Sequence, residues 1–319
     1  MDFDYPLVSI ITPSYNSGKF IEETILSIIN QSYKRIEYII IDGKSTDNTI
    51  DIIKKYEKIC SFRSESDFGQ SEAINKGWLS AKGDILAYIN ADDTYFQETV
   101  EIVVNYFRQN PDVMMIYGDF SIIDINSKKI LFVKSEQFDL KKLICLNNFI
   151  GQPTVFFRKE IIKKIGLLDT NLHYVMDLDF WIRIGSRYKI VYIPKNLANF
   201  RIHAKSKTIS EGYHKSLTEH IYILNKVFLN SNLPSELKSL KKMAYASAYY
   251  YAGRGYLRHH NIKDGLHYLI RAFYGNRRIF FDFYLFQIFL MLILGENNIK
   301  KTAKWMQRKF NLFKNIYIE

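Results

Sequence analysis

The chain has 319 residues, of which 47% are apolar and 15% aromatic, so it is long and apolar enough to bury a large core. Its two cysteines, Cys60 and Cys145, stand far apart and in no metal-binding spacing, which argues against a disulfide framework and a zinc site. The net charge of +11 is uneven, because residues 1–212 hold 27 basic and 27 acidic side chains whereas residues 213–319 hold 17 and 6. This basic last third predicts an anionic partner, either nucleic acid or a membrane surface.

The first 110 residues predict strands that alternate with helices. Apolar runs predict strands at 7–12, 36–41 and 85–89, and helical periodicity predicts helices at 19–31, 45–59, 70–81 and 95–109. Such alternation is typical of a parallel α/β sheet.

The pattern changes after Pro111. Strands are predicted at 113–117, 121–125, 130–133, 152–157 and 190–193, with a turn at 126–128 and a short helix at 177–186. A hairpin around the turn would add antiparallel edge strands, so the expected architecture is a mixed, mainly parallel sheet flanked by helices.

Residues 213–319 predict an all-helical extension. Helical patterns cover 213–229, 235–259 and 261–274, and the apolar segment 279–294 follows. Its 16 residues are fewer than the roughly 20 that cross a bilayer, and basic residues flank it. Two interpretations stay open: a segment in the membrane interface, or a helix buried against its neighbours. We therefore expect two domains, 1–212 and 213–319.

The central stretch is GDILAYINADD at residues 83–93, in which a buried strand ends in two carboxylates. Parallel sheets bind ligands beyond the carboxyl ends of their strands. Asp92 and Asp93 are therefore candidates to hold a divalent cation that bridges nucleotide phosphates. The alternative is that Asp93 caps the helix predicted from Tyr95.

Five motifs in order resemble the family 2 glycosyltransferases, which have the GT-A fold and use nucleotide-sugars. They cover about residues 6–208 and read VSIITPSYNSGKFIEETILSIINQSY, IIIDGKSTDNT, SESDFGQSEAINKGWLSAKGDILAYINADD, IGQPTVFFRKEIIKKIGLLDTNLHYVMDLDFWIRI and FRIHAKSKT. The last third lies outside the resemblance.

The resemblance implies a donor site at the first strands. Asp42 would accept hydrogen bonds from uracil or ribose, although it could also serve only as a turn residue. Tyr15 would stack on the base, with Thr12 and Pro13 shaping the pocket, although Tyr15 could instead be a core residue. Gln70 opens a helix whose free N–H groups favour an anion, or it is simply solvated.

The resemblance also implies a metal site. The family's Asp-x-Asp motif reads Asn90-Ala91-Asp92 here, so an amide replaces the first carboxylate. Asp92 would ligate Mg²⁺ or Mn²⁺, and Asn90 would contact ribose or a metal-bound water. His203 would reach the metal or the diphosphate, with a lone surface histidine as the alternative. Arg201 would contact the diphosphate.

Asp177 in MDLDFW is the implied general base. Met176 replaces the glutamate that the family usually carries before it, and Asp179 is the competing carboxylate. Inverting transfer needs one base to take the proton of the acceptor hydroxyl. Gln152 and Trp181 are implied acceptor contacts, with packing as the alternative role of Trp181.

The resemblance implies an inverting, metal-assisted glycosyltransferase that uses a nucleotide-sugar, most often a UDP-sugar. Its acceptor would be a saccharide or lipid-linked saccharide of a cell surface. Residues 1–5 do not resemble a signal peptide, so we expect a cytoplasmic protein, peripheral at the inner face of the plasma membrane. One rival is a non-catalytic nucleotide-sugar-binding or scaffold protein. A nucleic-acid binder is the other, and it is disfavoured because no basic–aromatic recognition motif is present.

Overall fold

The computed structural model divides into two compact units, Met1–Leu229 and Asn230–Glu319. It describes residues 5–145, 148–203, 206, 212–231, 233–258 and 261–276. The division falls after helix α9 (Gly212–Leu229), which therefore belongs to the first unit. The sequence pattern placed the boundary before this helix, at residue 212.

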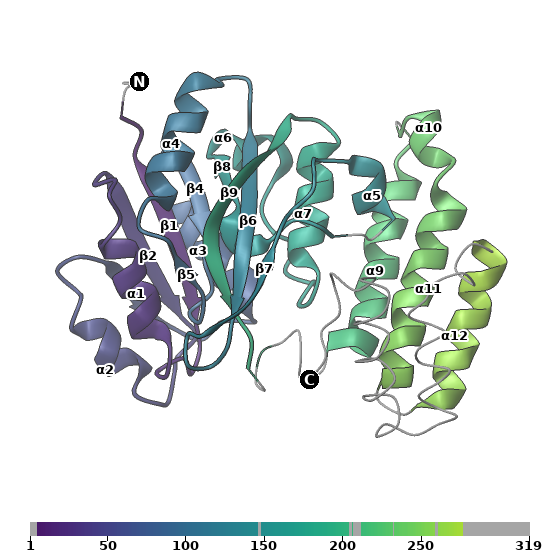
Figure 1. The fold of residues 1–319 in the computed structure, drawn as a ribbon, viewed down its shortest axis with the longest axis horizontal. Helices are drawn as coiled ribbons and strands as arrows, with labels where there is room; N and C mark the ends of the chain where they lie inside the picture. The colour runs from purple at the N-terminus through teal and green to yellow at the C-terminus, as the bar shows by residue number, and fades with distance from the viewer. Residues whose placement is uncertain are drawn as a thin grey trace, which may run out of the picture. The chain divides into compact units, whose positions relative to one another are not determined.

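The first unit is built on a mixed sheet (Figure 1). Its strands in the described part of the chain are β1 (Val8–Ser14), β2 (Ile36–Asp42), β3 (Ser61–Ser64), β4 (Ile85–Tyr88), β5 (Thr94–Tyr95), β6 (Met115–Ile123), β7 (Lys129–Val133), β8 (Phe156–Arg158) and β9 (Ile190–Arg201). They lie in the order β3-β2-β1-β4-β8-β6-β9-β5, and β7 pairs with β6. The first four are mutually parallel, and β8 is antiparallel to both neighbours. The expected mixed sheet is confirmed, with parallel pairing among β1, β2, β3 and β4 and antiparallel as well as parallel pairing beyond them.

Helices cover both faces of this sheet (Figure 1). The described helices of the first unit are, besides α9, α1 (Ile21–Ile29), α2 (Thr49–Lys54), α3 (Gln70–Ser80), α4 (Thr99–Gln109), α5 (Leu140–Ile144), α6 (Glu160–Ile165) and α7 (Met176–Gly185), with a 3₁₀ turn η1 (Gln152–Thr154). On one face α1, α2 and α4 share a buried apolar cluster with β1, β2 and β4. On the other, Trp78 of α3 contacts Phe157 of β8 and Phe180 of α7, with ring centroids 5.1 and 5.2 Å away.

A glycine sets the distance between α3 and the sheet. A Cβ on Gly77 would lie 2.5 Å from Ile11 Cγ2 of β1, which is closer than side chains approach. Because Gly77 has no side chain, α3 packs directly on β1. The first residue of α3, Gln70, is thereby fixed beside the carboxyl end of that strand.

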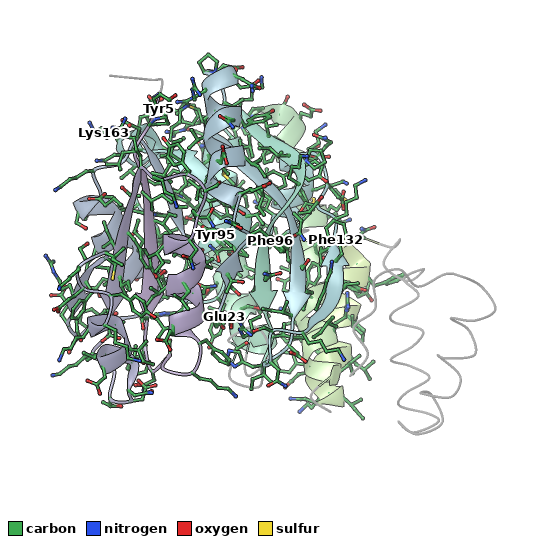
Figure 2. All side chains as sticks on the ribbon, turned by 60° about the vertical axis from the view of Figure 1, so that its left-hand side comes forward. Tyr5, Glu23, Tyr95, Phe96, Phe132 and Lys163 are labelled. Atoms are coloured by element: carbon green, nitrogen blue, oxygen red, sulfur yellow. The ribbon has the colours of Figure 1, made fainter. Side chains whose placement is uncertain are left out.

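Several predicted elements are corrected by the structure. The helix expected from Tyr95 begins at Thr99, because Thr94 and Tyr95 pair with β9 instead. Tyr95 is buried in the core whereas Phe96 is exposed (Figure 2). The strand expected at 152–157 is η1 followed by β8, and the two strands expected within 113–125 are the single strand β6.

The helix expected at 45–59 is only α2, because residues 45–47 form hydrogen bonds outside a helix. Ser45 donates to Asp42, and Thr46 donates its backbone N–H to Asn16 Oδ1 at 2.9 Å. Asp47 instead accepts the Thr49 N–H at 3.0 Å at the start of the shortened helix.

The second unit is helical in the part that the structure describes, as expected. Its helices are α10 (Ser235–Lys238), α11 (Lys241–Arg258) and α12 (Ile262–Gly275). Tyr249 of α11 stacks on Tyr268 of α12, with 6.2 Å between ring centroids, so the two helices pack against each other. Of the helices described, none combines the length and apolar content needed to cross a bilayer. The apolar segment 279–294 and the basic residues after it lie outside the described residues.

Candidate active site

The parallel strands bring the candidate donor residues to one edge of the sheet. Asp42 at the end of β2 pairs with Ser14 of β1 on one side and Ser64 of β3 on the other. β4 pairs with β1 up to Tyr88, so residues 89–93 leave the sheet at this same edge. This is the edge at which α/β sheets bind ligands.

Asp42 is fully buried and its carboxylate is held by hydroxyl groups. Oδ1 accepts from Ser45 Oγ at 2.5 Å, and Oδ2 accepts from Ser45 N at 2.9 Å and from Ser64 Oγ at 2.7 Å. A carboxylate has about four acceptor positions. These contacts fix the orientation of Asp42 and show why a buried carboxylate is tolerated here.

The residues after β1 differ in exposure. Tyr15 is 64% exposed, so its ring is available to a ligand and is not part of the core. Thr12 and Pro13 are buried, and the Thr12 hydroxyl accepts from Tyr38 Oη at 3.1 Å. Thr12 and Pro13 are therefore buried residues of β1 that anchor the start of the loop carrying Tyr15.

A chain of amides crosses the site and accounts for the asparagine of the Asp-x-Asp position. Asn90 Oδ1 accepts from Gln70 Nε2 at 2.6 Å, and Asn90 Nδ2 donates to Asp93 Oδ2 and Gln152 Oε1, both at 3.2 Å. Gln152 Nε2 donates in turn to the Tyr88 carbonyl at 2.9 Å. A carboxylate at position 90 could not donate to Asp93 and would repel it. The amide is therefore suited to this environment.

Asp92 and His203 meet at the edge of the site. Asp92 Oδ2 lies 3.0 Å from His203 Nε2, and both side chains are partly exposed. Their approach brings together one carboxylate and one imidazole that are 111 positions apart in the sequence. Among the residues that the structure describes, no three His, Cys, Asp or Glu side chains form a metal-ligand cluster.

Asp93 is a buried structural residue. Its Oδ1 accepts the Arg201 backbone N–H at 2.8 Å, which ties the motif to the end of β9. Burial, and after it the charge of Asp92, raises the pKa of the Asp93 carboxyl well above its ordinary value. The expected helix-capping role is not realised, because this side chain contacts β9 and the amide of Asn90 instead.

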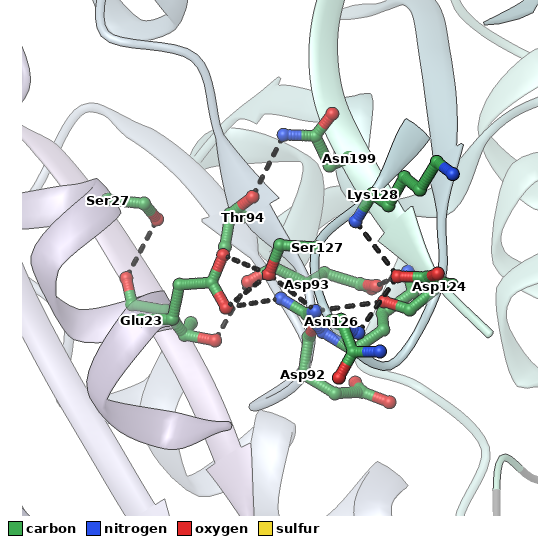
Figure 3. A network of polar contacts seen from close by, with 12 residues as sticks. Glu23, Ser27, Asp92, Asp93, Thr94, Asp124, Asn126, Ser127, Lys128 and Asn199 are labelled. Carbon is green, nitrogen blue, oxygen red and sulfur yellow. Dashed lines mark hydrogen bonds and ion pairs between the residues drawn. The ribbon is translucent and has the colours of Figure 1, made fainter. Parts of the chain in front are cut away.

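Arg201 is bonded into a structural network, of which Figure 3 labels the partners Glu23, Asp124 and Ser127. Its side chain is 1% exposed and donates to Glu23 Oε2 at 2.6 Å, to Ser127 Oγ at 2.9 Å and to backbone carbonyls. A guanidinium with its donors so engaged has no surface to offer a diphosphate. The role expected for Arg201 does not fit, and we assign it to holding β9 against α1 and the β6–β7 turn.

Asp177 lies in the first turn of α7 and is half-buried. Burial raises the pKa of Asp177 to about 6, although its carboxylate accepts the Leu178 N–H at 2.7 Å. The pKa of Tyr88 on β4 is raised mainly by burial. The charges of Asp177 and Asp93 raise it further. Asp177 therefore lies near enough to Tyr88, the last residue of β4, for its charge to act there. A carboxyl group with a pKa near 6 is suited to accept a proton at neutral pH.

The neighbouring candidates on α7 are structural. Asp179 is buried and is paired with Arg183 Nε at 2.8 Å and Lys226 Nζ at 2.9 Å, so its carboxylate is occupied. Trp181 is fully buried and packs beside Phe180. An acceptor sugar cannot reach Trp181 in this structure, so the expected acceptor role does not fit and the packing alternative holds.

Sequence reasoning missed the residues that support the site. Ser45 and Ser64 orient Asp42, and Glu219 of α9 binds the loop before α7. The two serines are polar residues in turn-like or short-strand sequence, where no periodicity marks them. Glu219 lies in a helix outside the motifs, and only the fold brings it to the site.

Comparison with known proteins gives the family. The family model for glycosyl transferase family 2 matches residues 9–166. An uncharacterized glycosyltransferase of Rickettsia typhi is 30% identical over 265 residues, which cover 76% of this chain and 83% of that protein. The chain belongs to glycosyl transferase family 2. The match to the family model ends at residue 166, before α7, so the segment that carries Asp177 lies outside the matched region.

Two further matches are informative. The putative teichuronic acid biosynthesis glycosyltransferase TuaG of Bacillus subtilis is 29% identical, covering 70% of this chain and 88% of TuaG. The structure of S. aureus TarS residues 1–349 in complex with UDP-GlcNAc has a TM-score of 0.64 at 17% identity, covering 86% of this chain and 82% of TarS. The TarS likeness shows the fold.

Proposed function

We propose that this glycosyltransferase moves a sugar from a UDP-sugar to an acceptor hydroxyl with inversion, and that Asp177 is the general base. The observation that supports the proposal is the state of Asp177, half-buried at the start of α7 with a pKa of about 6 and near enough to Tyr88 of β4 for its charge to act there. The UDP-GlcNAc complex of the structurally similar TarS supports a UDP-sugar as the donor class.

The reaction needs one proton acceptor. The acceptor oxygen attacks the anomeric carbon from the face opposite the diphosphate, and its proton passes to the Asp177 carboxylate. The bond from the anomeric carbon to the diphosphate oxygen breaks, and its electron pair leaves on UDP. Because the leaving diphosphate needs no proton when positive charge surrounds it, one carboxylate suffices.

Asp92 and His203 fit a divalent cation such as Mn²⁺ or Mg²⁺. The two groups lie 3.0 Å apart at the site and are partly exposed, so they can act as an oxygen and a nitrogen ligand on one side of an ion. Diphosphate oxygens and water would complete the shell. When bound, the cation supplies positive charge beside the leaving diphosphate.

We assign donor binding to the edge formed by β1, β2 and β4. Exposed Tyr15 would stack on the uracil. Asp42 is fully buried and held by Ser45 and Ser64, so the expected direct contact with the base or ribose does not fit, and we assign Asp42 to orienting the loop after β2. Gln70 and Asn90 lie between these residues and Asp92, at the N-terminus of α3, where an anion is favoured. Gln152 reaches Asn90 from the other side and is the candidate acceptor contact.

We further propose a surface polysaccharide or its lipid-linked precursor as the acceptor. The likeness to TuaG, whose name assigns it to teichuronic acid synthesis, supports this class. The charge excess of residues 213–319 supports placement of the chain at an anionic membrane surface on the cytoplasmic side.

The test is to incubate the full chain with UDP-, GDP- and dTDP-sugars, with and without Mn²⁺, and to measure release of the nucleoside diphosphate. Water replaces the acceptor in this slow reaction, so no acceptor need be known. We expect UDP release from at least one UDP-sugar, with stimulation by Mn²⁺. Binding of UDP without turnover of any donor would favour the non-catalytic alternative.

A further inference from the structure

The loop before α7 is held on one side by α3. Ser71 Oγ donates to the Leu172 carbonyl at 2.8 Å, and the amide of Asn75 pairs with both the N–H and the carbonyl of Leu168, at 3.0 and 2.9 Å. Both loop residues are buried. The helix that begins with Gln70 and the loop that leads to Asp177 are therefore directly bonded to each other.

On its other side, the loop is held by a carboxylate of α9. Glu219 Oε1 accepts the His173 N–H at 2.9 Å, and Oε2 accepts the N–H groups of Tyr174 and Val175 at 2.8 and 3.2 Å. Val175 is the N-cap of α7 and provides no side-chain cap. Glu219 therefore anchors the backbone that leads into α7, and its negative charge is favourable near the start of a helix.

The same face of α9 binds the segment at two more points. Tyr222 Oη and Lys226 Nζ donate to Asp169 Oδ2 at 3.0 and 2.9 Å. Lys226 also donates to Asp179 Oδ1 at 2.9 Å. Burial alone would raise the pKa of Asp169, but the hydrogen bonds that its carboxylate accepts and the charge of Lys226 outweigh burial and lower this pKa to about 2. Since residues three and four apart share a helix face, Glu219, Tyr222 and Lys226 act together, and we call them the α9 clamp.

We infer that the α9 clamp positions the general base. Asp177 lies between Val175, whose N–H binds Glu219, and Asp179, whose carboxylate binds Lys226. The clamp therefore fixes the first turn of α7 from both sides of Asp177. A shift of about 1 Å in a reacting group can lower a rate about 10²-fold, so this fixation governs turnover. The inference rests on the proposed function, because it takes Asp177 as the base.

The chemistry of Glu219 predicts a graded response. Glutamine keeps one carbonyl oxygen that can accept from Tyr174 and Val175, but its NH₂ group then faces the His173 N–H. Alanine leaves all three N–H groups without this acceptor. We therefore expect the kcat for UDP release to fall about 10-fold or more in Glu219→Ala and by a smaller factor in Glu219→Gln. The Kd for UDP should stay within about two-fold, because neither variant touches the proposed donor site.

A matched control separates positioning from general destabilisation. Val104 is buried in α4, in the apolar cluster on the opposite face of the sheet, so Val104→Ala lowers the melting temperature without touching the loop. We expect its kcat at 15 °C to equal that of the wild type. Hydrogen exchange gives a readout that needs no turnover: the backbone N–H groups of residues 173–178 should exchange faster in Glu219→Ala and at the wild-type rate in Val104→Ala.

The outcomes distinguish this inference from the proposed function. If Asp177→Asn is inactive and Glu219→Ala retains the wild-type kcat, the positioning role is overturned while the base assignment stands. A kcat that falls equally in Val104→Ala and Glu219→Ala overturns it as well. A wild-type chain without turnover, or an active Asp177→Asn, overturns the proposed function and with it the positioning role.

Discussion

Replacing Asp177 by Asn should stabilise the fold at neutral pH. Burial raises the pKa of this carboxyl from 3.8 to about 6, so its charged form is less favourable in the folded chain than in the unfolded chain. The difference is about 2 pKa units, and at about 1.4 kcal/mol per unit it opposes folding by about 3 kcal/mol. Asparagine has nearly the same shape and no charge, and its Oδ1 can still accept the Leu178 N–H.

The stability difference between Asp177→Asn and the wild type depends on pH. The carboxyl is charged in both states above about pH 6, where the full cost applies, and it is protonated in both states below 3.8, where the cost vanishes. Urea unfolding should therefore show Asp177→Asn more stable than the wild type by up to about 3 kcal/mol at pH 8 and by less than about 1 kcal/mol at pH 4.

Asp179→Asn, on the same helix, is the matched control for this measurement. It removes the charge that pairs with Arg183 and Lys226, so it should lower stability at pH 8 by about 1 kcal/mol or more. A variant Asp177→Asn that is as stable as the wild type at pH 8, or less stable, would refute the reasoning that Asp177 is a desolvated carboxylate.

Three further predictions concern activity, ligand binding and location. The kcat for UDP release should fall below about pH 6 and reach about one-tenth of its plateau at pH 5, because Asp177 must be deprotonated; a flat profile down to pH 4.5 would exclude it as the titrating base. UDP with Mn²⁺ should raise the melting temperature more than UDP alone, and Asp92→Ala should remove that difference; an unchanged response would place the cation elsewhere. The full chain should sediment with anionic liposomes at low salt and be released at high salt, and its failure to sediment would exclude the membrane proposal. That binding should weaken on charge reversal at Lys300, Lys301 and Lys304.

The sheet's centre could be predicted because its strands are buried on both faces. In β1, β2 and β4 apolar residues follow one another without alternating with polar ones, which is typical of strands covered on both faces. Gln70–Ser80 has clear helical periodicity. By contrast, β3 reads SFRS, which carries one apolar side chain, and its pairing with β2 is made by the backbone. Such an edge strand leaves almost no signal in the sequence pattern.

The site could be predicted as far as motifs identify residue types. Asp42, Asp92 and His203 lie at the expected edge, and the charge of Asp177 acts on Tyr88 at the end of β4. Residue type did not determine whether a side chain reaches the surface, and burial removed Arg201 and Trp181 from the candidates. The contacts made by Glu219 join residues 44 to 46 positions apart, so no local pattern could reveal them.

The rate of Asp177→Asn is the most direct test of the central claim. The measurement is UDP release from the preferred UDP-sugar at pH 7.5 in the full chain, with the Kd for UDP determined on the same preparation. Our account predicts a kcat at least about 10²-fold below the wild-type value and a Kd within about two-fold of it, as expected for loss of a general base. A variant that turns over near the wild-type rate would contradict the assignment of Asp177 as the base.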